Sequence, residues 1–307
     1  MELKQLLALV TVGDTGSVTK AARLLHVVQP AVSRYIRALE DEVGVPLFER
    51  SRQGMTLTPA GEVLAERARR ALLELDRARA EIRPDREHVR GIVTIGLLES
   101  TVELVAAPLV EALGRRHPGI EVRILSAFSG HLRQWLDDGA VDMSLLYNVN
   151  STPSIAVTPL LSEALWAIAP PDAELGPEAL TWDRVCENRL ILPVEGHGLR
   201  TLVDEALGTA PTIACQTNSM PVQKRLVAAG TGWSVLPAAG VAEDVAAGRL
   251  RGGPIVDPAV SRTIVLALPR SGRIPPAAEV AATEIVRVTH RLVEDGTWPT
   301  ASVAQSG

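Results

Sequence analysis

Residues 16–61 read GSVTKAARLLHVVQPAVSRYIRALEDEVGVPLFERSRQGMTLTPAG, and this stretch decides the fold of the N-terminal part of the 307-residue chain. Ser17 stands where it can cap a short helix, in which the apolar residues of AARLL at 21–25 are expected to face inward. The residues HVVQ at 26–29 predict a tight turn, and Pro30 falls where the first turn of a following helix accepts proline. Two short helices around a turn predict a unit shaped to enter a DNA major groove.

Helices are predicted on both sides of that first short helix. Before it, LKQLLALV at 3–10 has apolar residues at helical spacing, and this helix is expected to end before Gly13. After the turn, VSRYIRALEDEV at 32–43 has apolar residues at steps of four, three and four, which predicts a narrow stripe facing the core. The three helices would share that core.

The opposite face of the helix after the turn is small, polar and cationic. At 100° per residue its polar residues lie away from the apolar stripe. Glutamine and arginine side chains can make paired hydrogen bonds to adenine and guanine edges. A solvated surface is the commoner explanation on an isolated helix, but the preceding helix and turn favour base reading here. The candidate DNA-contacting residues of the two helices are Lys20, Gln29, Pro30, Ser33, Arg34 and Arg37.

A hairpin, or wing, is predicted next, because PLFERSRQGMTLT at 46–58 has two short β-prone runs around Gly54. Arg50 and Arg52 are expected to touch flanking DNA phosphates, contacts that position a protein without reading sequence. The net charge of −5 does not oppose DNA binding, because residues 1–90 hold 15 basic and 13 acidic residues. Salt screens fields beyond about 8–10 Å, so local charge decides phosphate binding.

A long helix is predicted from about residue 58 to residue 83. Its apolar residues step by four, three, four, three and four, the heptad spacing of a two-helix seam, and its alanines permit close approach. A surface helix packed on its own domain is the alternative. We favour dimerisation, because reading two DNA half-sites needs two reading units. The seam residues are Leu64, Ala68, Ala71, Leu75, Ala78 and Ile82, and a charged hinge, PDREHVR, follows at 84–90.

From residue 91 onward strand-like and helix-like stretches alternate, which predicts α/β layers with mostly parallel sheets. The strand-like stretches are IVTIGL, EVRILSA, VDMSLL, LWAIAP, RLILP, TIACQ, WSVLP and TIVLALP. Ligands in such sheets bind at the carboxyl ends of strands, where helix N-termini point their N–H groups. Each polar residue there could simply cap a helix, but their recurrence at several strand ends favours a cleft. The candidate ligand-contacting residues are Ser100, Thr101, Ser129, Tyr147, His197 and Asn218.

The sequence disfavours several other classes of protein and site. It has no G-x-S-x-G elbow, P-loop, Rossmann fingerprint or H-E-x-x-H motif, so we expect no enzyme, no metal and no cofactor. No stretch approaches the roughly 20 apolar residues that cross a bilayer, so we expect a cytoplasmic protein without a membrane partner. Cys186 and Cys215 are expected to be small apolar packing residues, with a redox switch between them as the alternative.

The segment 16–61 resembles the winged helix-turn-helix of the LysR-type transcriptional regulators, and the likeness continues across almost the whole chain. The residues that match the family's groove-reading and wing positions are Gln29, Pro30, Ser33, Arg34, Arg50 and Arg52. One position departs from the pattern, because the family usually has serine or threonine where this chain has Val28.

The resemblance implies three successive parts: a largely helical winged helix-turn-helix domain at 1–58, a linker and dimerisation helix with its hinge at 59–90, and an effector domain at 91–299. The effector domain would be α/β and two-lobed, like the periplasmic binding proteins. One lobe would cover about 91–161 and 268–295, and the other about 162–267. The stretches SGHLRQWLDDGAVDMSLLY and LILPVEGHGLR are most similar to the nitrogen assimilation control branch.

The function that the resemblance implies is sequence-specific regulation of transcription under the control of a small-molecule effector. Its partners would be promoter DNA, the effector, further copies in a dimer or tetramer, and RNA polymerase if the chain is an activator. Ser100 and Ser129 match the family's effector-contacting hydroxyls. Glu99 would either compete with a carboxylate effector and favour a neutral or amine-bearing one, or simply point away. The alternatives are a DNA-architectural protein without sequence preference and an α/β enzyme fused to a DNA-binding domain. The residues TASVAQSG at 300–307 predict a tail without order.

Overall fold

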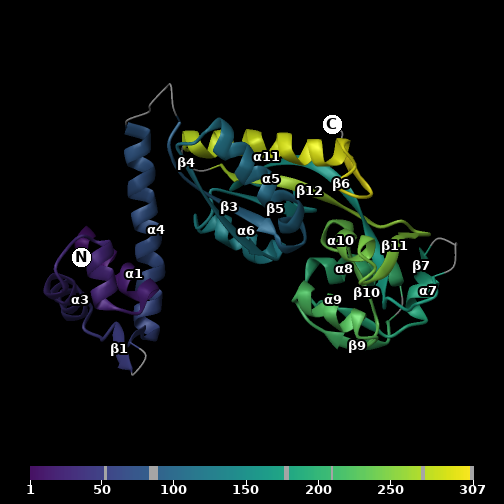
Figure 1. Cartoon of the computed structure of the whole chain (residues 1–307), viewed down its shortest axis with the longest axis horizontal. Coiled ribbons are helices and arrows are strands. Elements are labelled where there is room, and N and C mark those ends of the chain that lie inside the picture. Colours follow the sequence, from purple (N-terminus) through teal and green to yellow (C-terminus); the bar gives the residue numbers. More distant parts are fainter. Residues whose placement is uncertain (52–53, 83–88, 176–179, 209, 271–273, 305–307) are drawn as a thin grey trace. The chain divides into compact units, whose positions relative to one another are not determined.

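The computed structural model describes residues 1–51, 54–82, 89–175, 180–208, 210–270 and 274–304, and leaves the side chains of residues 50–51, 73, 76–77 and 79–82 undescribed. The chain divides into two compact units, Met1–Pro84 and Asp85–Gly307 (Figure 1). The predicted hinge at 84–90 lies largely outside the described residues, as does Arg52. Each unit has its own hydrophobic core.

The N-terminal unit contains three short helices, a hairpin and one long helix, as the sequence predicts. Its elements are α1 (Leu3–Thr15), α2 (Val18–Leu24), α3 (Gln29–Val43), β1 (Phe48–Ser51), β2 (Gly54–Leu57) and α4 (Pro59–Ile82). Ser17 caps α2 by accepting the backbone N–H of Lys20 at 3.4 Å. Helix α1 runs further than expected, through Gly13, and ends where Gly16 adopts a left-handed conformation.

The helix-turn-helix is held by one apolar stripe on α3. Val32, Ile36 and Leu39 are buried in the core of this unit, which includes residues of α1 and α2. Val43, at the end of the predicted stripe, is 37% exposed. The expectation that Leu24 faces inward is wrong, because its side chain is 63% exposed and the alanines of AARLL fill the core instead.

The hairpin is anchored to the end of α1. Its antiparallel register pairs Arg50 with Met55, and the backbone N–H of Met55 donates to the carbonyl of Gly16 at 2.9 Å. Gly54 has a φ of +127°, and a Cβ there would stand 2.4 Å from the Gly16 oxygen. Only glycine fits this position, so the wing is fixed beside the end of α1.

Helix α4 is buried along its first turns and exposed further on. It packs against α1 (Figure 1), and Ala68 is only 2% exposed in the core of this unit, where Leu64 is partly buried. Ala68 therefore stabilises its own domain, which corrects its assignment to a dimer seam, whereas Leu64 stays partly exposed and its assignment remains a prediction. The remaining predicted seam residues are Ala71, Leu75 and Ala78, all exposed, and Ile82, whose side chain is undescribed.

The first lobe of the C-terminal unit is a mixed sheet with helices on both faces. Its elements are β3 (Gly91–Leu98), η1 (Glu99–Thr101), α5 (Val102–Arg116), β4 (Ile120–Ala127), α6 (Ser129–Asp137), β5 (Met143–Tyr147), β6 (Ile155–Ala169), β12 (Ser261–Pro269) and α11 (Pro276–Glu294). Strands β3, β4 and β5 are parallel, and the antiparallel β12 and β6 complete the order β4-β3-β5-β12-β6. Helices α5 and α11 pack side by side on one face, and α6 covers the other (Figure 1).

The second lobe continues from β6 with a smaller set of parallel strands. Its elements are β7 (Leu180–Thr181), α7 (Trp182–Cys186), β8 (Leu190–Leu192), α8 (Gly198–Leu207), β9 (Ile213–Gln216), α9 (Met220–Ala228), β10 (Trp233–Pro237), η2 (Ala238–Gly240), α10 (Ala242–Ala246) and β11 (Arg251–Val256). The strand order is β6-β10-β8-β9, with β10, β8 and β9 parallel and β11 placed against β6 and β7. All the strand-like stretches of the sequence form strands.

The chain crosses between the lobes along β6 and returns along β12. On β6, Leu161 belongs to the core of the first lobe and Leu165 to the core of the second. On the return, Val260 packs against the second core and Ile264 already belongs to the first. The return crossing therefore lies at about 261–263, several residues before the expected 267–268, because β12 pairs with β5 from Ile264 onward.

Residues 300–304 are part of the fold. Residues Ala301–Val303 form β13, which pairs with β6 opposite Glu163 and its neighbours. The hydroxyl of Thr300 accepts a hydrogen bond from the indole N–H of Trp166 at 3.0 Å. The prediction of a tail without order is therefore wrong for the described residues, because the small side chains permit pairing along β6.

Candidate functional site

The start of α3 presents the predicted base-reading residues on an open surface. Gln29, Pro30, Arg34 and Arg37 are exposed, and Ser33 is half-buried. The side-chain amide of Gln29 donates to the Ser33 hydroxyl at 3.4 Å. The structure therefore brings these residues together on the face opposite the core. Their polar members carry the donors and acceptors that recognise base edges in a major groove.

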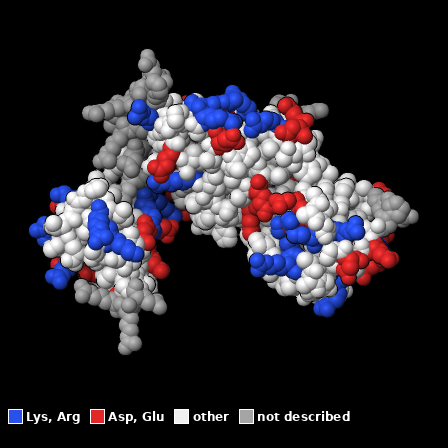
Figure 2. All heavy atoms as spheres, viewed as in Figure 1, with Lys and Arg blue, Asp and Glu red and all other residues white. Residues whose placement is uncertain are grey.

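A cationic border surrounds this face. Lys20 on α2 is exposed like Arg34 and Arg37, and none of the three forms an ion pair with a described carboxylate. The Arg34 guanidinium lies 6.0 Å from the ring centre of Tyr35. Basic side chains are visible on the surface of this unit in Figure 2. The side chain of Arg50 is outside the described residues, so only its position on β1 is known.

Val28 is the N-cap residue of α3 and makes no side-chain cap hydrogen bond. Its side chain is 70% exposed, and the nearby Leu24 and Val27 are 63% and 38% exposed. Apolar side chains therefore border the polar face of α3 at the point where a serine hydroxyl could bond to a helix N–H.

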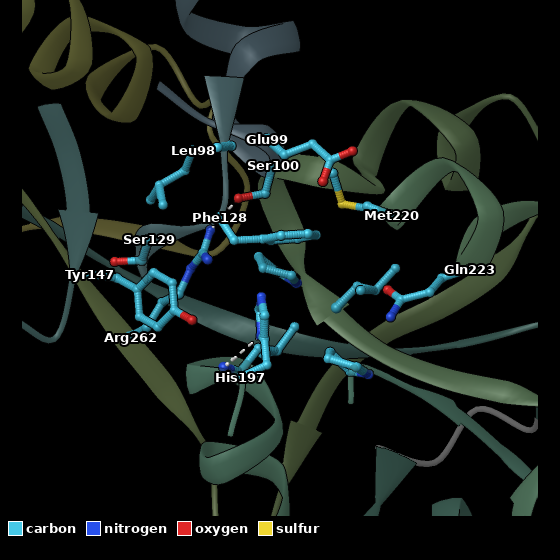
Figure 3. A pocket seen from close by; sticks show the side chains of 15 residues that line it. Leu98, Glu99, Ser100, Phe128, Ser129, Tyr147, His197, Met220, Gln223 and Arg262 are labelled. Carbon is cyan, nitrogen blue, oxygen red and sulfur yellow. Dashed lines mark hydrogen bonds between the residues drawn. The ribbon is translucent and has the colours of Figure 1, made fainter. Parts of the chain in front are cut away.

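A cleft lies between the two lobes of the C-terminal unit, at the carboxyl ends of their strands (Figure 3). An inner hollow lies between the strand ends, and an outer hollow adjoins it at the start of α8. The predicted residues that line the inner hollow are Ser100, Ser129, Tyr147 and His197. Asn218 lines only the outer hollow, and its side-chain oxygen already accepts the N–H of Val194 at 3.0 Å.

Thr101 is not a cleft residue. Its side chain is fully buried, and its hydroxyl donates to the carbonyl of Leu98 at 2.9 Å. Predicting it as a ligand contact is therefore wrong, because successive side chains of the η1 turn point in different directions.

Arg262, on β12, is the cleft residue that sequence reasoning missed. Its guanidinium lies 2.5 Å from the carboxylate of Glu163, and the two side chains are 3% and 0% exposed. The Nη2 of Arg262 also donates to the Ser100 hydroxyl at 2.6 Å. The second oxygen of Glu163 accepts the indole N–H of Trp298 at 2.9 Å. Nothing in the sequence signals this network beyond an arginine at the head of a strand-like stretch.

The cleft holds two titratable rings that are uncharged near neutral pH. Burial raises the pKa of Tyr147 above 10.0, although Arg262 and the backbone of Leu199 oppose the shift. The Arg262 guanidinium lies 4.9 Å from the Tyr147 ring centre. Burial also lowers the pKa of His197 below 6.5, and the charges of Arg262 and His131 lower it further.

The ring of His197 offers one unused hydrogen-bond donor. Its Nδ1 accepts the N–H of Leu199 at 3.3 Å, so the proton of the neutral ring resides on Nε2. That nitrogen is buried and has no hydrogen-bond partner in the described part of the chain. The Phe128 ring stands perpendicular to the imidazole, with ring centres 4.5 Å apart, and supplies no lone pair.

Glu99 reaches across the cleft to the other lobe. Burial raises its pKa, whereas a hydrogen bond from the backbone of Met220 and the charge of Lys224 oppose the shift. Figure 3 shows the carboxylate turned toward Met220, the first residue of α9. Glu99 therefore occupies the N-terminus of a helix in the opposite lobe.

The two cysteines lie outside this cleft. Cys186 and Cys215 are free thiols, and burial followed by the charge of Asp183 raises the pKa of Cys186, which disfavours a reactive thiolate. Over the described residues no cluster of three histidine, cysteine or acidic side chains is arranged to hold a metal ion. Among the described helices, none combines the length and hydropathy that a bilayer crossing requires.

Known proteins match both units. The model of the bacterial regulatory helix-turn-helix protein of the lysR family matches residues 3–62, and that of the LysR substrate binding domain matches residues 86–289. The transcriptional regulator BbuR of Bordetella bronchiseptica is 28% identical over 94% of this chain and 90% of its own length. The nitrogen assimilation regulatory protein nac of Klebsiella aerogenes is 28% identical, covering 95% of this chain and 96% of its own. The solved structure of full-length CbnR complexed with its target DNA shares the fold, with a TM-score of 0.69 and 24% identity over 94% of this chain and all of that one.

Proposed function

The chain belongs to the LysR family of bacterial regulators, and we propose that the start of α3 reads promoter DNA under the control of a small molecule bound in the inter-lobe cleft. As a member of that family it is a DNA-binding transcriptional regulator with an effector-binding domain, and not an enzyme. The proposal assigns roles to its particular residues. A protein that binds promoter DNA in a bacterium would be located in the cytoplasm.

The polar face of α3 would read bases and its cationic border would hold phosphates. Gln29 and Arg34 supply the side chains suited to adenine and guanine edges, and Ser33 supplies a hydroxyl. Lys20 and Arg37 are exposed cations without described acidic partners, which suits them to phosphates. Arg50 and Arg52 would extend these contacts through the wing. The observation that carries this assignment is the clustering, at the start of α3, of polar side chains with cations that have no described acidic partner.

The exposed part of α4 would join two copies of the chain. Ala71, Leu75 and Ala78 continue the heptad beyond the turns that pack on α1, and Leu75 leaves 46% of its surface exposed. A partner helix would cover this strip, and Ile82 would extend it. Two dimers would pair through their C-terminal units into a tetramer. RNA polymerase would be a further partner if the chain activates transcription.

The cleft would couple ligand binding to DNA binding through the two lobes. Ser100, Ser129 and Tyr147 come from the first lobe and His197 from the second, so one ligand can touch both. A ligand that binds the closed arrangement more tightly shifts the population toward it. Lobe closure would change the spacing of the DNA-reading pairs in the assembly, which is the coupling that control requires.

The DNA-reading assignment is tested by selecting a binding site from a random double-stranded library and comparing it with random DNA at fixed salt. We expect the selected site to bind at least about a thousandfold more tightly. Arg34→Ala should reduce that preference by about 1–3 kcal/mol, whereas Arg115→Ala, a control in an exposed pair on α5, should keep it. Equal affinity for both DNAs would favour an architectural protein instead.

The effector assignment is tested with a reporter carrying the selected site, in cells grown on a panel of metabolites. The wild-type chain should respond to at least one of them. Ser129→Trp, which fills the hollow, should abolish the response, whereas Ser126→Trp on the exposed surface of β4 should not. A response that survives Ser129→Trp would contradict this cleft as the effector site.

A further inference from the structure

We infer that the cleft takes an uncharged, mostly apolar small molecule bearing a hydrogen-bond acceptor, and that it rejects carboxylates. The inference rests on the proposed function, because it names the chemical class of the ligand for the same cleft. The charges of the cleft, its lining and the buried, unpartnered Nε2–H of His197 carry it.

The cation of the inner hollow is already neutralised. Arg262 is the single lysine or arginine among the described residues that line it, and its Nε and Nη2 lie 2.7 and 2.5 Å from one oxygen of Glu163. Its Nη2 also donates to the Ser100 hydroxyl oxygen at 2.6 Å. An entering carboxylate would meet a net-neutral pair and would lose its hydration without gaining an unpaired cation.

The helix N-terminus that could attract an anion is already occupied. The carboxyl group of Glu99 is turned toward the backbone of Met220 at the start of α9. The cation next along that helix, Lys224, lies 2.8 Å from Asp244. If Glu99 is ionised it repels a second carboxylate, and if it is protonated it still fills the position.

The outer hollow repels anions as well. Its described lining includes the exposed Glu195 and Glu205, and among those lining residues there is no lysine or arginine. Two histidines, His131 and His197, also line it. Burial lowers the pKa of His197, and the charges of Arg262 and His131 lower it further. An anion near the inner hollow would therefore meet an acidic neighbouring surface.

The inner hollow is suited to an apolar body with one acceptor. Leu98, Phe128 and Met220 are among its lining residues, and they come from both lobes. The His197 Nε2–H is buried without a described partner, and leaving such a donor unpaired is unfavourable. A carbonyl oxygen or ring nitrogen on the ligand would satisfy this donor while apolar atoms fill the space beside it.

The test uses benzamide and benzoate as probes, because they share one ring and differ in the charge of the polar group. Calorimetry on the full-length protein at pH 7.5 should give benzamide a Kd at least about tenfold lower than that of benzoate. Bound benzamide should shift the Nε2–H resonance of His197. His197→Phe should weaken benzamide about tenfold, whereas His290→Phe, outside both hollows, should leave it unchanged.

Glu99→Gln should tighten benzoate about threefold or more while leaving benzamide unchanged, since it removes a like charge. Glu111→Gln, an exposed control on α5, should alter neither probe. Benzoate binding as tightly as benzamide, and weakened by His197→Phe, would overturn the inference yet leave the cleft as an effector site. Failure of both probes to bind, or benzamide binding that ignores His197→Phe, would also overturn it. The Ser129→Trp reporter experiment judges the proposed function separately.

Discussion

Arg262 and Glu163 are direct cross-strand partners on β12 and β6, at the place where both strands pass between the lobes. Their ion pair of 2.5 Å is almost fully buried. Arg262 also donates a hydrogen bond to Ser100 in the first lobe, and Glu163 accepts one from Trp298. A buried charge pair thus lies at the crossing about which the lobes would close.

Removing one partner of this buried pair should lower the free energy of unfolding far more than breaking an ion pair on the surface. Glu163→Gln leaves the Arg262 charge buried without its counter-charge, so the free energy of unfolding of the C-terminal unit should fall by about 3–5 kcal/mol. Urea unfolding followed by tryptophan fluorescence measures it. Glu187→Gln breaks the exposed pair with Arg184 and should cost less than about 1 kcal/mol. Similar losses in the two variants would contradict the role given to the buried pair.

Val28→Ser should strengthen DNA binding without sharpening its specificity. A serine hydroxyl can accept an N–H at the start of α3, stabilising the helix by about 1 kcal/mol, and can donate to a phosphate. Affinity for the selected site and for random DNA should therefore rise by a similar factor in fluorescence anisotropy titrations. A change confined to the selected site would mean that residue 28 contacts bases.

Arg34 and Lys20 should behave differently when truncated. Arg34→Ala should weaken binding to the selected site by about 1–3 kcal/mol and relax the preference at one base pair. Lys20→Ala should weaken all sequences alike and reduce the salt slope of binding by about 1. Titrations on both DNAs at several salt concentrations measure these effects. Equal salt slopes for wild type and Lys20→Ala would remove Lys20 from the phosphate contacts.

Substitutions at Leu75 and Ala68 should affect different properties, assembly at Leu75 and folding at Ala68, although both residues belong to the same heptad pattern. Leu75→Glu puts a charge on the exposed strip and should dissociate the dimer while α4 keeps its helicity. Ala68→Glu puts a charge into the core of the N-terminal unit and should unfold that unit. Sedimentation velocity reports the first outcome and circular dichroism the second. A Leu75→Glu chain that stays dimeric would exclude this strip as the seam.

His197 should make the C-terminal unit less stable under mildly acidic conditions. Its pKa is lowered in the folded chain, so as the pH falls below 6.5 the unfolded chain binds the proton first and stability is lost. Above 6.5 the contribution does not change with pH. Urea unfolding from pH 7.5 down to pH 5 should show a steeper loss in the wild-type chain than in His197→Gln. Parallel curves would mean that the ring titrates normally.

The sequence predicts the elements of this chain far better than it predicts its contacts. Strand and helix positions follow from local periodicity, and the face of α3 follows from the three residues that fill its core. The heptad pattern of α4 can also be found from local sequence. Its spacing does not show, however, whether the apolar residues pack against a partner helix or against α1 of the same chain. The spacing therefore predicts Ala68 as a seam residue, whereas the structure places it in the core of its own domain.

The position of the candidate cleft is predictable from the sequence, whereas its chemistry is not. Ser129, Tyr147 and His197 can be found because strand ends are recognisable in the chain. Arg262 cannot, because it meets Ser100 across 162 residues and no local pattern encodes that contact. Thr101 is wrongly included because position at a helix start does not give the direction of a side chain.

The strand β13 also matters for how the protein is handled. Ala301 pairs with Glu163, and Trp298 bonds to the same carboxylate, so the last described residues hold the group that neutralises the cleft arginine. A shortened chain lacking Trp298 would lose one of the two hydrogen bonds to the second Glu163 oxygen, beside the cleft arginine. An affinity tag should therefore be attached through a spacer that is long enough to keep the tag away from both β13 and α3.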